Sequence, residues 1–349
     1  MFLGKPDRAY LDKVIYRRLG AARREVIVGP RFGVDNAVVR VGTRKVLVAT
    51  ADPLSFIPAL GAVDSAWLSV NLIASDLATS GFAPQYGIFD FNLPPRMKDS
   101  AFSDYWTSFH NECSRLGLAI IGGHTGRYQG CDYTVIGGGI MYAIGDEGRY
   151  LISSMGEAND DIILTKGAAI ETTAVLTRSF PRTVRRALGT RLFEQAKRYL
   201  RKVTTVNDAL TAASVGVHQE GVTSMHDATE GGVLAAVSEL TNAAKLGAEL
   251  DLQSIPIAQE TEEICRFFQI DPLISLSEGS LVITCKPYRT SKVLDKLNAA
   301  KIESRVIGQL SSKTRYVYGS NGKGRIRIRY PKSDPYWKAY WKATKKHWT

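Results

Sequence analysis

Hydrophobic positions recur along this chain in two patterns: short apolar runs that predict strands, and stretches with three-to-four-residue spacing that predict helices. The predicted strands are residues 37–41, 46–50, 118–121, 134–144, 162–165, 280–284 and 325–330. The predicted helices are residues 66–80, 103–116, 170–180, 191–199, 206–218 and 231–245. The two patterns alternate, which indicates an α/β or α+β fold rather than an all-β fold.

Local signals predict the ends of two of these helices. Asp64 or Ser65 can cap the helix at residues 66–80, and Gly81 can end it. Thr229 is a suitable N-cap for the helix at residues 231–245. Polar side chains as well as periodicity therefore define both helices.

The length of the chain predicts two domains. It has 349 residues, and domains commonly contain about 100–200. A polar, glycine-containing stretch at residues 145–159 separates two blocks that each have their own strands and helices. We therefore expect an N-terminal domain at residues 1–150, a C-terminal domain at residues 151–320 and a tail at residues 321–349.

Composition excludes several classes of protein. A hydrophobic fraction of 44% is ordinary for a globular chain and argues against disorder. No stretch approaches the roughly 18 consecutive apolar residues of a membrane span, and charges interrupt the N-terminal residues where a signal peptide would be apolar. The four cysteines lack metal-type spacing. We expect a cytoplasmic protein with reduced, mostly buried thiols.

Basic residues are unevenly distributed. The formal net charge is +11, and residues 323–349 contain nine Lys or Arg against Asp334 alone. A second cluster at residues 178–202 contains nine Lys or Arg against Glu194 alone. The chain is therefore a nearly neutral body with two basic patches. Each patch is either a solvated face or a surface that attracts anions.

Six polar positions suggest a binding site. Asp35, Asp52, His124, Lys166 and Asp227 are each expected just after an apolar strand and just before a turn or helix, and Asp76 lies near the end of an apolar helix. Carboxylates, a lysine and glycine-rich turns together are typical of a site for a divalent cation and polyphosphate. Taken singly, each residue is more often a turn former, a cap or a solvated side chain. The sequence lacks the P-loop, dinucleotide, GxSxG and HExxH motifs.

The motifs resemble those of the aminoimidazole ribonucleotide (AIR) synthase superfamily, which includes thiamine monophosphate kinase, selenophosphate synthetase and the hydrogenase maturation factor HypE. The matching segments occur in the family's order, and the HypE-like branch is the most similar. They are GVDNAVV, ATADPLSF, VNLIASDLATSGFAP, IIGGHTG, DIILTKGAAIETTAVL and MHDATEGGV. The likeness extends from about residue 5 to residue 313.

This resemblance implies a two-domain AIR synthase-like fold whose N-terminal domains form a homodimer through a shared β-barrel. It implies ATP and Mg²⁺ as cofactors, with Asp35, Asp52, Asp76 and Asp227 as the metal and phosphate carboxylates. Other positions carried over to the nucleotide site are Asn36, Asn71, His124, Thr125, Lys166 and Gly167. The implied function is an ATP- and Mg²⁺-dependent enzyme that phosphorylates or activates a small acceptor.

Several positions depart from the family pattern. Asn36 replaces the second Asp of a pair, Ala228 replaces a Pro, and His124 replaces the Asp of the thiamine monophosphate kinase motif. The chain ends KKHWT rather than in the cysteine of HypE, and no cysteine precedes Cys113 as selenophosphate synthetase would require. Neither of those two reactions is therefore expected, and the acceptor stays unassigned. The alternatives are a nucleic-acid-associated RNA-modification factor on the same fold and a non-catalytic dimeric scaffold.

The tail combines aromatic and basic residues beyond the end of the family match. Tyr336, Trp337, Tyr340 and Trp341 fall at helical i,i+4 spacing among lysines. These rings can bind RNA by stacking, lie at a membrane surface, or attach a terminal helix to the body. We expect residues 334–349 to be dispensable for the fold and for ATP binding.

Overall fold

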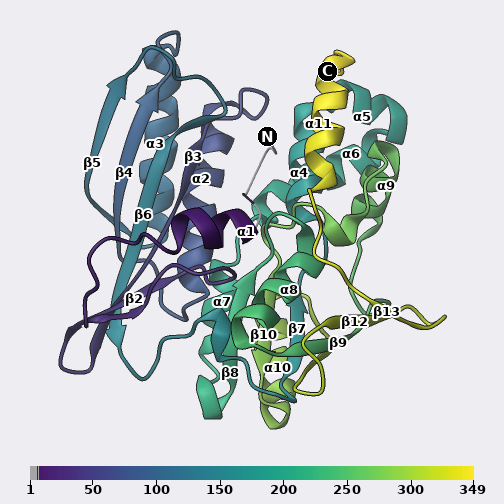
Figure 1. Cartoon of the computed structure of the whole chain (residues 1–349). Coiled ribbons are helices and arrows are strands. Elements are labelled where there is room, and N and C mark those ends of the chain that lie inside the picture. Colours follow the sequence, from purple (N-terminus) through teal and green to yellow (C-terminus); the bar gives the residue numbers. More distant parts are fainter. Residues whose placement is uncertain (1–5, 7) are drawn as a thin grey trace.

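The computed structural model describes residue 6 and residues 8–349, which form two mixed α/β halves side by side (Figure 1). Within these residues, each half is built on one sheet, and all but one adjacent strand pair in each sheet is antiparallel. The mixed two-sheet architecture confirms the expected α/β (α+β) fold class. None of the described helices is long and apolar enough to cross a membrane.

The N-terminal sheet has the strand order β1-β2-β3-β6-β4-β5. Its strands are β1 (Val26–Val28), β2 (Ala37–Gly42), β3 (Lys45–Ser55), β4 (Tyr86–Leu93), β5 (Ala119–Arg127) and β6 (Val135–Asp146). Helices α2 (Gly61–Ala78) and α3 (Asp99–Arg115) cover one face of this sheet, and the short α1 (Arg8–Tyr10) lies between the halves (Figure 1). The opposite face is exposed.

The C-terminal sheet has the strand order β13-β12-β9-β11-β7-β10-β8. Its strands are β7 (Asp161–Thr165), β8 (Val222–Asp227), β9 (Gly247–Asp251), β10 (Leu281–Cys285), β11 (Ser304–Ser311), β12 (Val317–Ser320) and β13 (Arg325–Arg327). The helices of this half are α4 (Ile170–Ser179), α5 (Pro181–Leu188), α6 (Thr190–Lys197), α7 (Val206–Ala213), α8 (Gly232–Ala244), α9 (Gln259–Phe268), α10 (Thr290–Ala299) and α11 (Pro335–Lys345).

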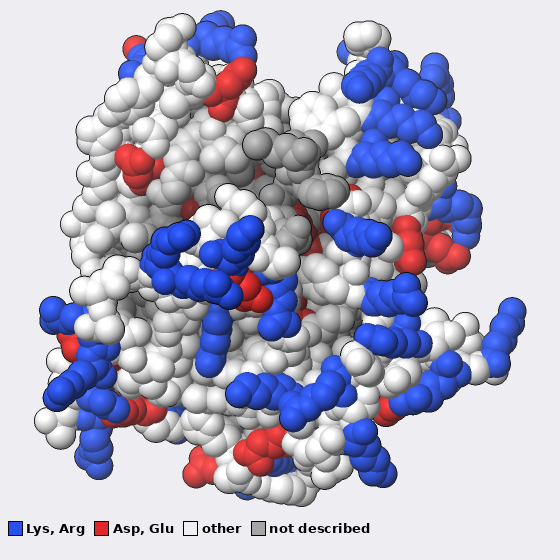
Figure 2. All heavy atoms as spheres, viewed as in Figure 1, with Lys and Arg blue, Asp and Glu red and all other residues white. Residues whose placement is uncertain are grey.

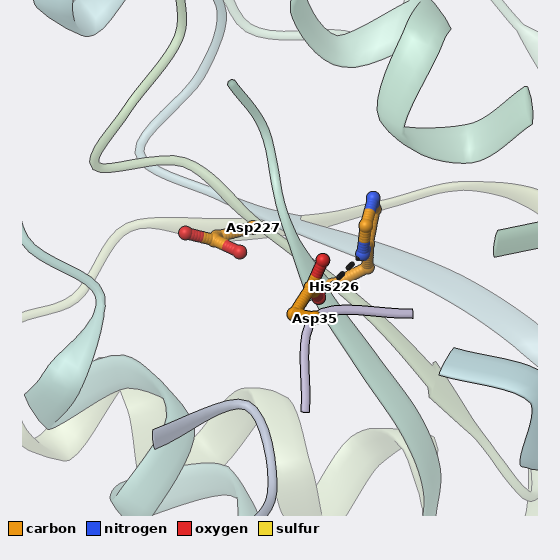
Figure 3. Close-up of side chains that lie close together, drawn as sticks. All are labelled: Asp35, His226 and Asp227. Atoms are coloured by element: carbon orange, nitrogen blue, oxygen red, sulfur yellow. Dashed lines mark hydrogen bonds and ion pairs between the residues drawn. The ribbon is translucent and has the colours of Figure 1, made fainter. Parts of the chain in front are cut away.

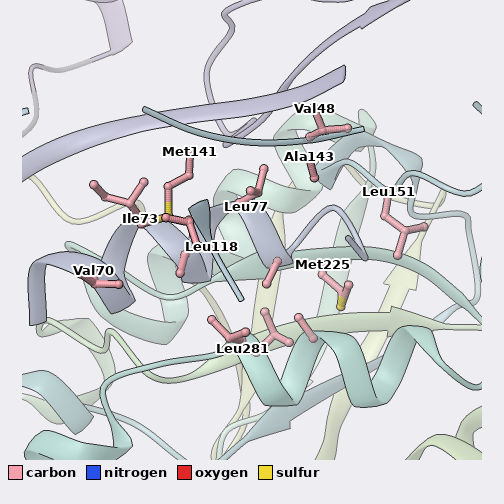
Figure 4. Packing of buried hydrophobic residues seen from close by; sticks show 14 of the residues in the cluster. Val48, Val70, Ile73, Leu77, Leu118, Met141, Ala143, Leu151, Met225 and Leu281 are labelled. Carbon is pink, nitrogen blue, oxygen red and sulfur yellow. The ribbon is translucent and has the colours of Figure 1, made fainter. Parts of the chain in front are cut away.

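One hydrophobic core joins the two halves. Val70 and Leu77 of α2 pack in the same cluster as Met141 of β6, and Met225 of β8 and Leu281 of β10 complete it from the C-terminal sheet (Figure 4). Burying apolar surface stabilises a protein by about 25 cal/mol per Å². Helix α2 is therefore held between the two sheets, and this fixes the side chains at its C-terminal end.

Some expected boundaries are wrong. Helix α2 begins at Gly61, so neither Asp64 nor Ser65 is its N-cap; Asp64 pairs with Arg178 and Arg201 instead. Helix α8 is preceded by Gly231 in the left-handed region, not by Thr229 as cap. The expected end of α2 is confirmed, because Gly81 follows it with a φ of 81°.

The tail belongs to the body of the protein. Tyr336, Ala339 and Ala343 of α11 are buried in a cluster that also contains Phe180 and Phe268. Tyr336 and the partly buried rings of Trp337 and Tyr340 therefore attach the helix to the body, which favours this interpretation over RNA or membrane binding. The expectation that residues 334–349 are dispensable for the fold is not supported, because their removal would expose this cluster.

Candidate functional site

Carboxylates from both halves meet where the two halves adjoin. Asp35 precedes β2, Asp52 lies within β3, and Asp76 lies in the last turn of α2. Asp227 ends β8 in the C-terminal sheet and is buried. The carboxylates of Asp35 and Asp227 lie within 4.8 Å of one another and of a ring nitrogen of His226 (Figure 3). The expected positions directly after strands hold for Lys166, but not for Asp35, Asp52 or His124.

His226 connects the two halves through hydrogen bonds to carboxylates. Its Nδ1 lies 2.6 Å from Asp35 Oδ2, and its Nε2 lies 2.8 Å from Glu239 Oε2 (Figure 3). Burial alone would lower the pKa of His226, but the charge of Asp35 and the hydrogen bonds to both carboxylates raise it well above its usual value. Both ring nitrogens therefore donate, and the imidazolium has no lone pair for a metal.

The close approach of the Asp35 loop to α8 depends on a glycine. Gly33 has a φ of 76°, and a Cβ there would lie 2.6 Å from the carbonyl oxygen of Glu239. A larger residue would push the loop away from α8. The network continues beyond the loop, because the Tyr330 hydroxyl donates to Glu239 Oε1 at 2.6 Å.

Two further glutamates extend the group of carboxylates. Burial raises the pKa of Glu278 well above its usual value, and the charges of Asp227, Glu171, Asp76 and Asp52 raise it further. Burial also raises the pKa of Glu171 to about 8, with additional contributions from Asp334, Glu230 and Asp52. These mutual effects place the acids in one electrostatic neighbourhood. We call the following residues the acid cluster: Asp35, Asp52, Asp76, Glu171, Asp227 and Glu278.

The donor atoms of the acid cluster fit a hard divalent cation. They are all carboxylate oxygens, which Mg²⁺ and Ca²⁺ prefer, and no cysteine lies among them. Carboxylates gathered in a buried place repel one another, and a cation relieves that repulsion. Asp35 and Asp227 each place a carboxylate oxygen within 4.8 Å of the other.

Asn36 has a structural reason to differ from the family's aspartate. Its side-chain nitrogen donates to the Asp76 carbonyl at 2.9 Å and to Thr79 Oγ1 at 2.8 Å. A carboxylate could not donate these bonds. Thr50 Oγ1 also donates to the Asp35 carbonyl and to Asp76 Oδ2. These contacts hold the end of α2 against the Asp35 loop.

Other residues expected at a nucleotide site have partners elsewhere. The Asn71 amide donates to Glu112 Oε1 at 2.7 Å inside the N-terminal half. Lys166 Nζ donates to the Thr204 carbonyl at 2.6 Å and pairs with Asp208 at 2.9 Å. A role for either residue in nucleotide binding stays a prediction.

His124 and Thr125 lie in the middle of the edge strand β5, where both are exposed. His124 Nε2 lies 2.6 Å from the Tyr128 hydroxyl. Gly167 has a φ of 110°, and a Cβ there would meet the Pro256 carbonyl at 2.5 Å. The packing of the loop after β7 therefore already requires this glycine, whatever the ligand.

Sequence reasoning missed His226, Glu239, Glu278 and Tyr330. His226 adjoins Asp227 in the motif MHDATEGG, so that motif contained a signal for it. Glu278 directly precedes Gly279 before an apolar strand, a context like that of the acids that were found. Glu239 and Tyr330 are paired only by the fold, since they are 91 positions apart.

The chain is a two-domain α/β protein with a cluster of carboxylates where its halves adjoin. The N-terminal domain model of AIR synthase related protein matches residues 33–141, and the C-terminal domain model matches residues 157–319. The chain belongs to this AIR synthase related family.

Individual relatives are distant but match most of the chain. A hydrogenase expression/formation protein of Methanocaldococcus jannaschii is 23% identical over 343 residues, covering 95% of this chain and 96% of the relative. The crystal structure of Escherichia coli HypE has a TM-score of 0.69 at 20% identity, covering 83% of this chain and 87% of that one. A structure of HypE in complex with ATP has a TM-score of 0.63 at 16% identity, covering 94% and 93%. These structures share the fold of this chain.

Proposed function

We propose that this protein is an ATP- and Mg²⁺-dependent enzyme that phosphorylates or otherwise activates a small acceptor molecule. The observation that carries the proposal is the convergence of Asp35, Asp52, Asp76 and Asp227 from both halves into one acid cluster. The complex of the structural relative HypE with ATP supports the choice of nucleotide. When bound, Mg²⁺ would offset the charge of the phosphates during phosphoryl transfer.

In this proposal the protein's own residues position the metal ligands. His226 holds Asp35 from the C-terminal half, while Thr50 and Asn36 hold Asp76 from the N-terminal half. Asp227 belongs to a fully buried strand, so its position is set by the sheet. Preorganised ligands bind more tightly, because little ordering remains to be done on binding.

Metal and nucleotide should bind cooperatively. The acid cluster repels the triphosphate, whose charge has the same sign, so we expect negligible nucleotide affinity without a cation. Mg²⁺ removes part of that repulsion and bridges carboxylate to phosphate oxygens. Calorimetric titration of a non-hydrolysable ATP analogue, with Mg²⁺ and with EDTA, measures this dependence.

Two substitutions test the site directly. Asp76→Asn and Asp227→Asn each remove one charge at nearly constant size, and each should weaken Mg²⁺-dependent binding at least about tenfold. Asp295→Asn, on the exposed side of α10, is the matched control and should bind as the unaltered protein does. Unchanged affinity in both test variants, or no binding by the unaltered protein with Mg²⁺, would refute the site.

We do not propose the nucleic-acid alternative for the 178–202 patch or for the tail. Among the described residues of the 178–202 patch, Arg178 and Arg201 pair with Asp64, and Arg185 pairs with Glu194. The aromatic residues of the tail pack largely against the body. Rings that pack against the body are not open for stacking, so we do not propose RNA binding through the tail. ATP turnover by the isolated protein would distinguish an enzyme from a scaffold.

We also infer a homodimer through the N-terminal sheet. The face of this sheet opposite α2 exposes a group of large apolar side chains, and an apolar patch of this kind on a soluble protein usually marks an interface. It comprises Tyr86, Ile88, Ile121, Val135, Ile140 and Ile144. Ile88 and Ile140 lie opposite one another on the paired strands β4 and β6. The shared β-barrel stays a prediction.

Light scattering at micromolar concentration tests this inference. The protein should have the mass of a dimer, and Ile88→Lys with Ile140→Lys should reduce it to a monomer. Ile257→Lys, an exposed apolar residue of the C-terminal half, is the control and should leave the mass unchanged. A monomeric unaltered protein would contradict the inference.

A further inference from the structure

A pocket beside α8, distinct from the acid cluster, has five basic and three aromatic residues in its lining. It has a volume of about 610 Å³ and lies between α1, α8, the hairpin β12–β13 and residues 328–334. A volume of this size suits a small molecule. Figure 2 shows Lys and Arg side chains across the face of the molecule over α1, α8 and the hairpin.

Positive charge dominates the lining of this pocket. Five basic side chains line it, against the two acids Glu230 and Asp334; they are Arg8, Arg315, Arg327, Arg329 and Lys332. Asp334 is buried, where it accepts hydrogen bonds from the backbone of Gly231 and Tyr336. That carboxylate therefore caps the adjoining helices rather than neutralising the pocket.

Most of the basic groups have no carboxylate partner in the described part of the chain. Of the five, Arg8 forms an ion pair there, with Asp12. Arg315 donates to the Lys245 carbonyl, and Arg327 stacks 3.5 Å from the ring centroid of Tyr316. Several cations gathered around one cavity repel one another, and an anion relieves that repulsion.

We propose that this pocket binds a small molecule carrying a phosphate or carboxylate group. Guanidinium groups match the paired oxygens of both anions, and four of the five basic lining residues are arginines. Aromatic rings at Phe32, Tyr316 and Tyr330 and the hydroxyls of Ser238 and Thr241 offer apolar and polar contacts for the rest of the ligand. The residues that form the pocket after position 319 lie outside the segment that the family models match.

The pocket and the acid cluster are physically connected. Tyr330 lines the pocket and donates to Glu239, which contacts His226, which in turn contacts Asp35. Glu230 also lines the pocket, and its charge contributes to raising the pKa of Glu171 in the acid cluster. The pocket does not depend on the proposed ATP site for its own binding, so the two can be tested separately.

Titration without divalent cations isolates the pocket. In EDTA the acid cluster repels anions, so binding of inorganic phosphate or pyrophosphate at constant ionic strength reports the basic lining. Citrate provides the carboxylate arm of the same experiment. We expect at least one of the three probes to bind with a dissociation constant below about 1 mM, which corresponds to about 4 kcal/mol. If phosphate or pyrophosphate binds more tightly than citrate, the anionic group of the ligand is a phosphate; if citrate binds more tightly, it is a carboxylate.

Paired charge variants decide whether binding occurs in the pocket. Arg329→Gln with Lys332→Gln removes two charges from the lining and should weaken binding at least tenfold. Lys323→Gln with Lys338→Gln removes the same charge from exposed positions outside the pocket and should leave affinity within about twofold. All four side chains are exposed, so both proteins should fold, which thermal unfolding verifies.

Two results would overturn the proposal. One is the absence of binding by all three probes to the unaltered protein. The other is an equal loss in the two double variants, which would show that net charge alone attracts the probe. Mg²⁺-dependent binding of the ATP analogue to the pocket variant should stay unchanged, so failure of the pocket and failure of the ATP site are distinguishable.

Discussion

Replacing His226 tests the electrostatic connection between the two halves. The substitution His226→Gln keeps a polar side chain of similar reach but removes the positive charge between Asp35 and Glu239. His226 is 3% exposed and Glu239 is 6% exposed, so water cannot compensate for the lost charge. Removing one partner of a buried ion pair costs roughly 3–5 kcal/mol. We expect the free energy of unfolding at pH 7 to fall by about this amount.

Urea unfolding measures the effect, with His124→Gln as the matched control. His124 is exposed and contacts the Tyr128 hydroxyl, so its replacement should change stability by less than about 0.5 kcal/mol. The double variant with Glu239→Gln should lose less than the sum of the two single variants, because it also removes the buried carboxylate that loses its partner. A loss below about 1 kcal/mol in His226→Gln would refute the argument.

The pH dependence of this effect has a defined sign. The folded-state pKa of His226 is raised well above its usual value, so the folded protein binds this proton more tightly than the unfolded chain does. The contribution of His226 to stability is therefore complete below about pH 6.5. It decreases as the pH rises through the raised pKa. The difference in the free energy of unfolding between the unaltered protein and His226→Gln should therefore decrease only at high pH.

Two further predictions concern the acid cluster and the tail. In EDTA, Glu171→Gln should become more stable than the unaltered protein as the pH rises from about 4.5 to about 8, because the pKa of Glu171 is raised to about 8 and ionising it in place costs ~1.4 kcal/mol per pKa unit. Urea unfolding across this range, with exposed Glu303→Gln as control, should show several kcal/mol of divergence; parallel curves would contradict it. Removing residues 334–349 should yield insoluble or markedly destabilised protein in an expression and thermal-unfolding test, since Phe180 and Phe268 lose their cover. A soluble truncated protein with an unchanged unfolding midpoint would contradict that.

The long helices were predictable because their signal is local. Helix α3 begins four residues before its predicted start and ends one residue before its predicted end, and α8 differs from its prediction by one residue at each end. Apolar periodicity over more than ten residues is enough to locate such a helix. Helix starts that depend on capping were less predictable. The α2 start lies at Gly61, which no polar cap precedes.

Strand β8, which the hydrophobic pattern did not predict, shows why other features of the fold were missed. Its sequence VTSMHD is largely polar, yet all six residues are buried. Thr223 and Ser224 bond to Thr284 on the neighbouring strand, and His226 bonds to Asp35 in the other half. Buried polar groups are tolerated when they are hydrogen bonded, but these partners are 60 or more positions away. No periodicity in one segment contains that information.

The candidate site shows the same contrast between what a local motif predicts and what packing decides. The family-like motifs selected the four aspartates as candidates, and in the structure the charges of Asp52, Asp76 and Asp227 act on Glu278. The motifs also proposed Asn71 and Lys166, whose side chains have close partners in Glu112 and Asp208. A motif thus identifies which residue types recur, whereas the direction of each side chain depends on packing.

The two proposed binding surfaces differ in the sign of their charge. The aspartates of the acid cluster favour a divalent cation, and without one they repel any ligand that carries a phosphate or carboxylate. In our proposals, an anionic ligand that binds without a divalent cation is therefore held by positive groups at another place, and Arg329 and Lys332 belong to that pocket. A chain of contacts between the basic pocket and the acid cluster must be compatible with positive charge at one end and negative charge at the other. The chain of Tyr330, Glu239 and His226 meets this condition, because a neutral hydroxyl faces the basic pocket and a cationic imidazolium faces Asp35.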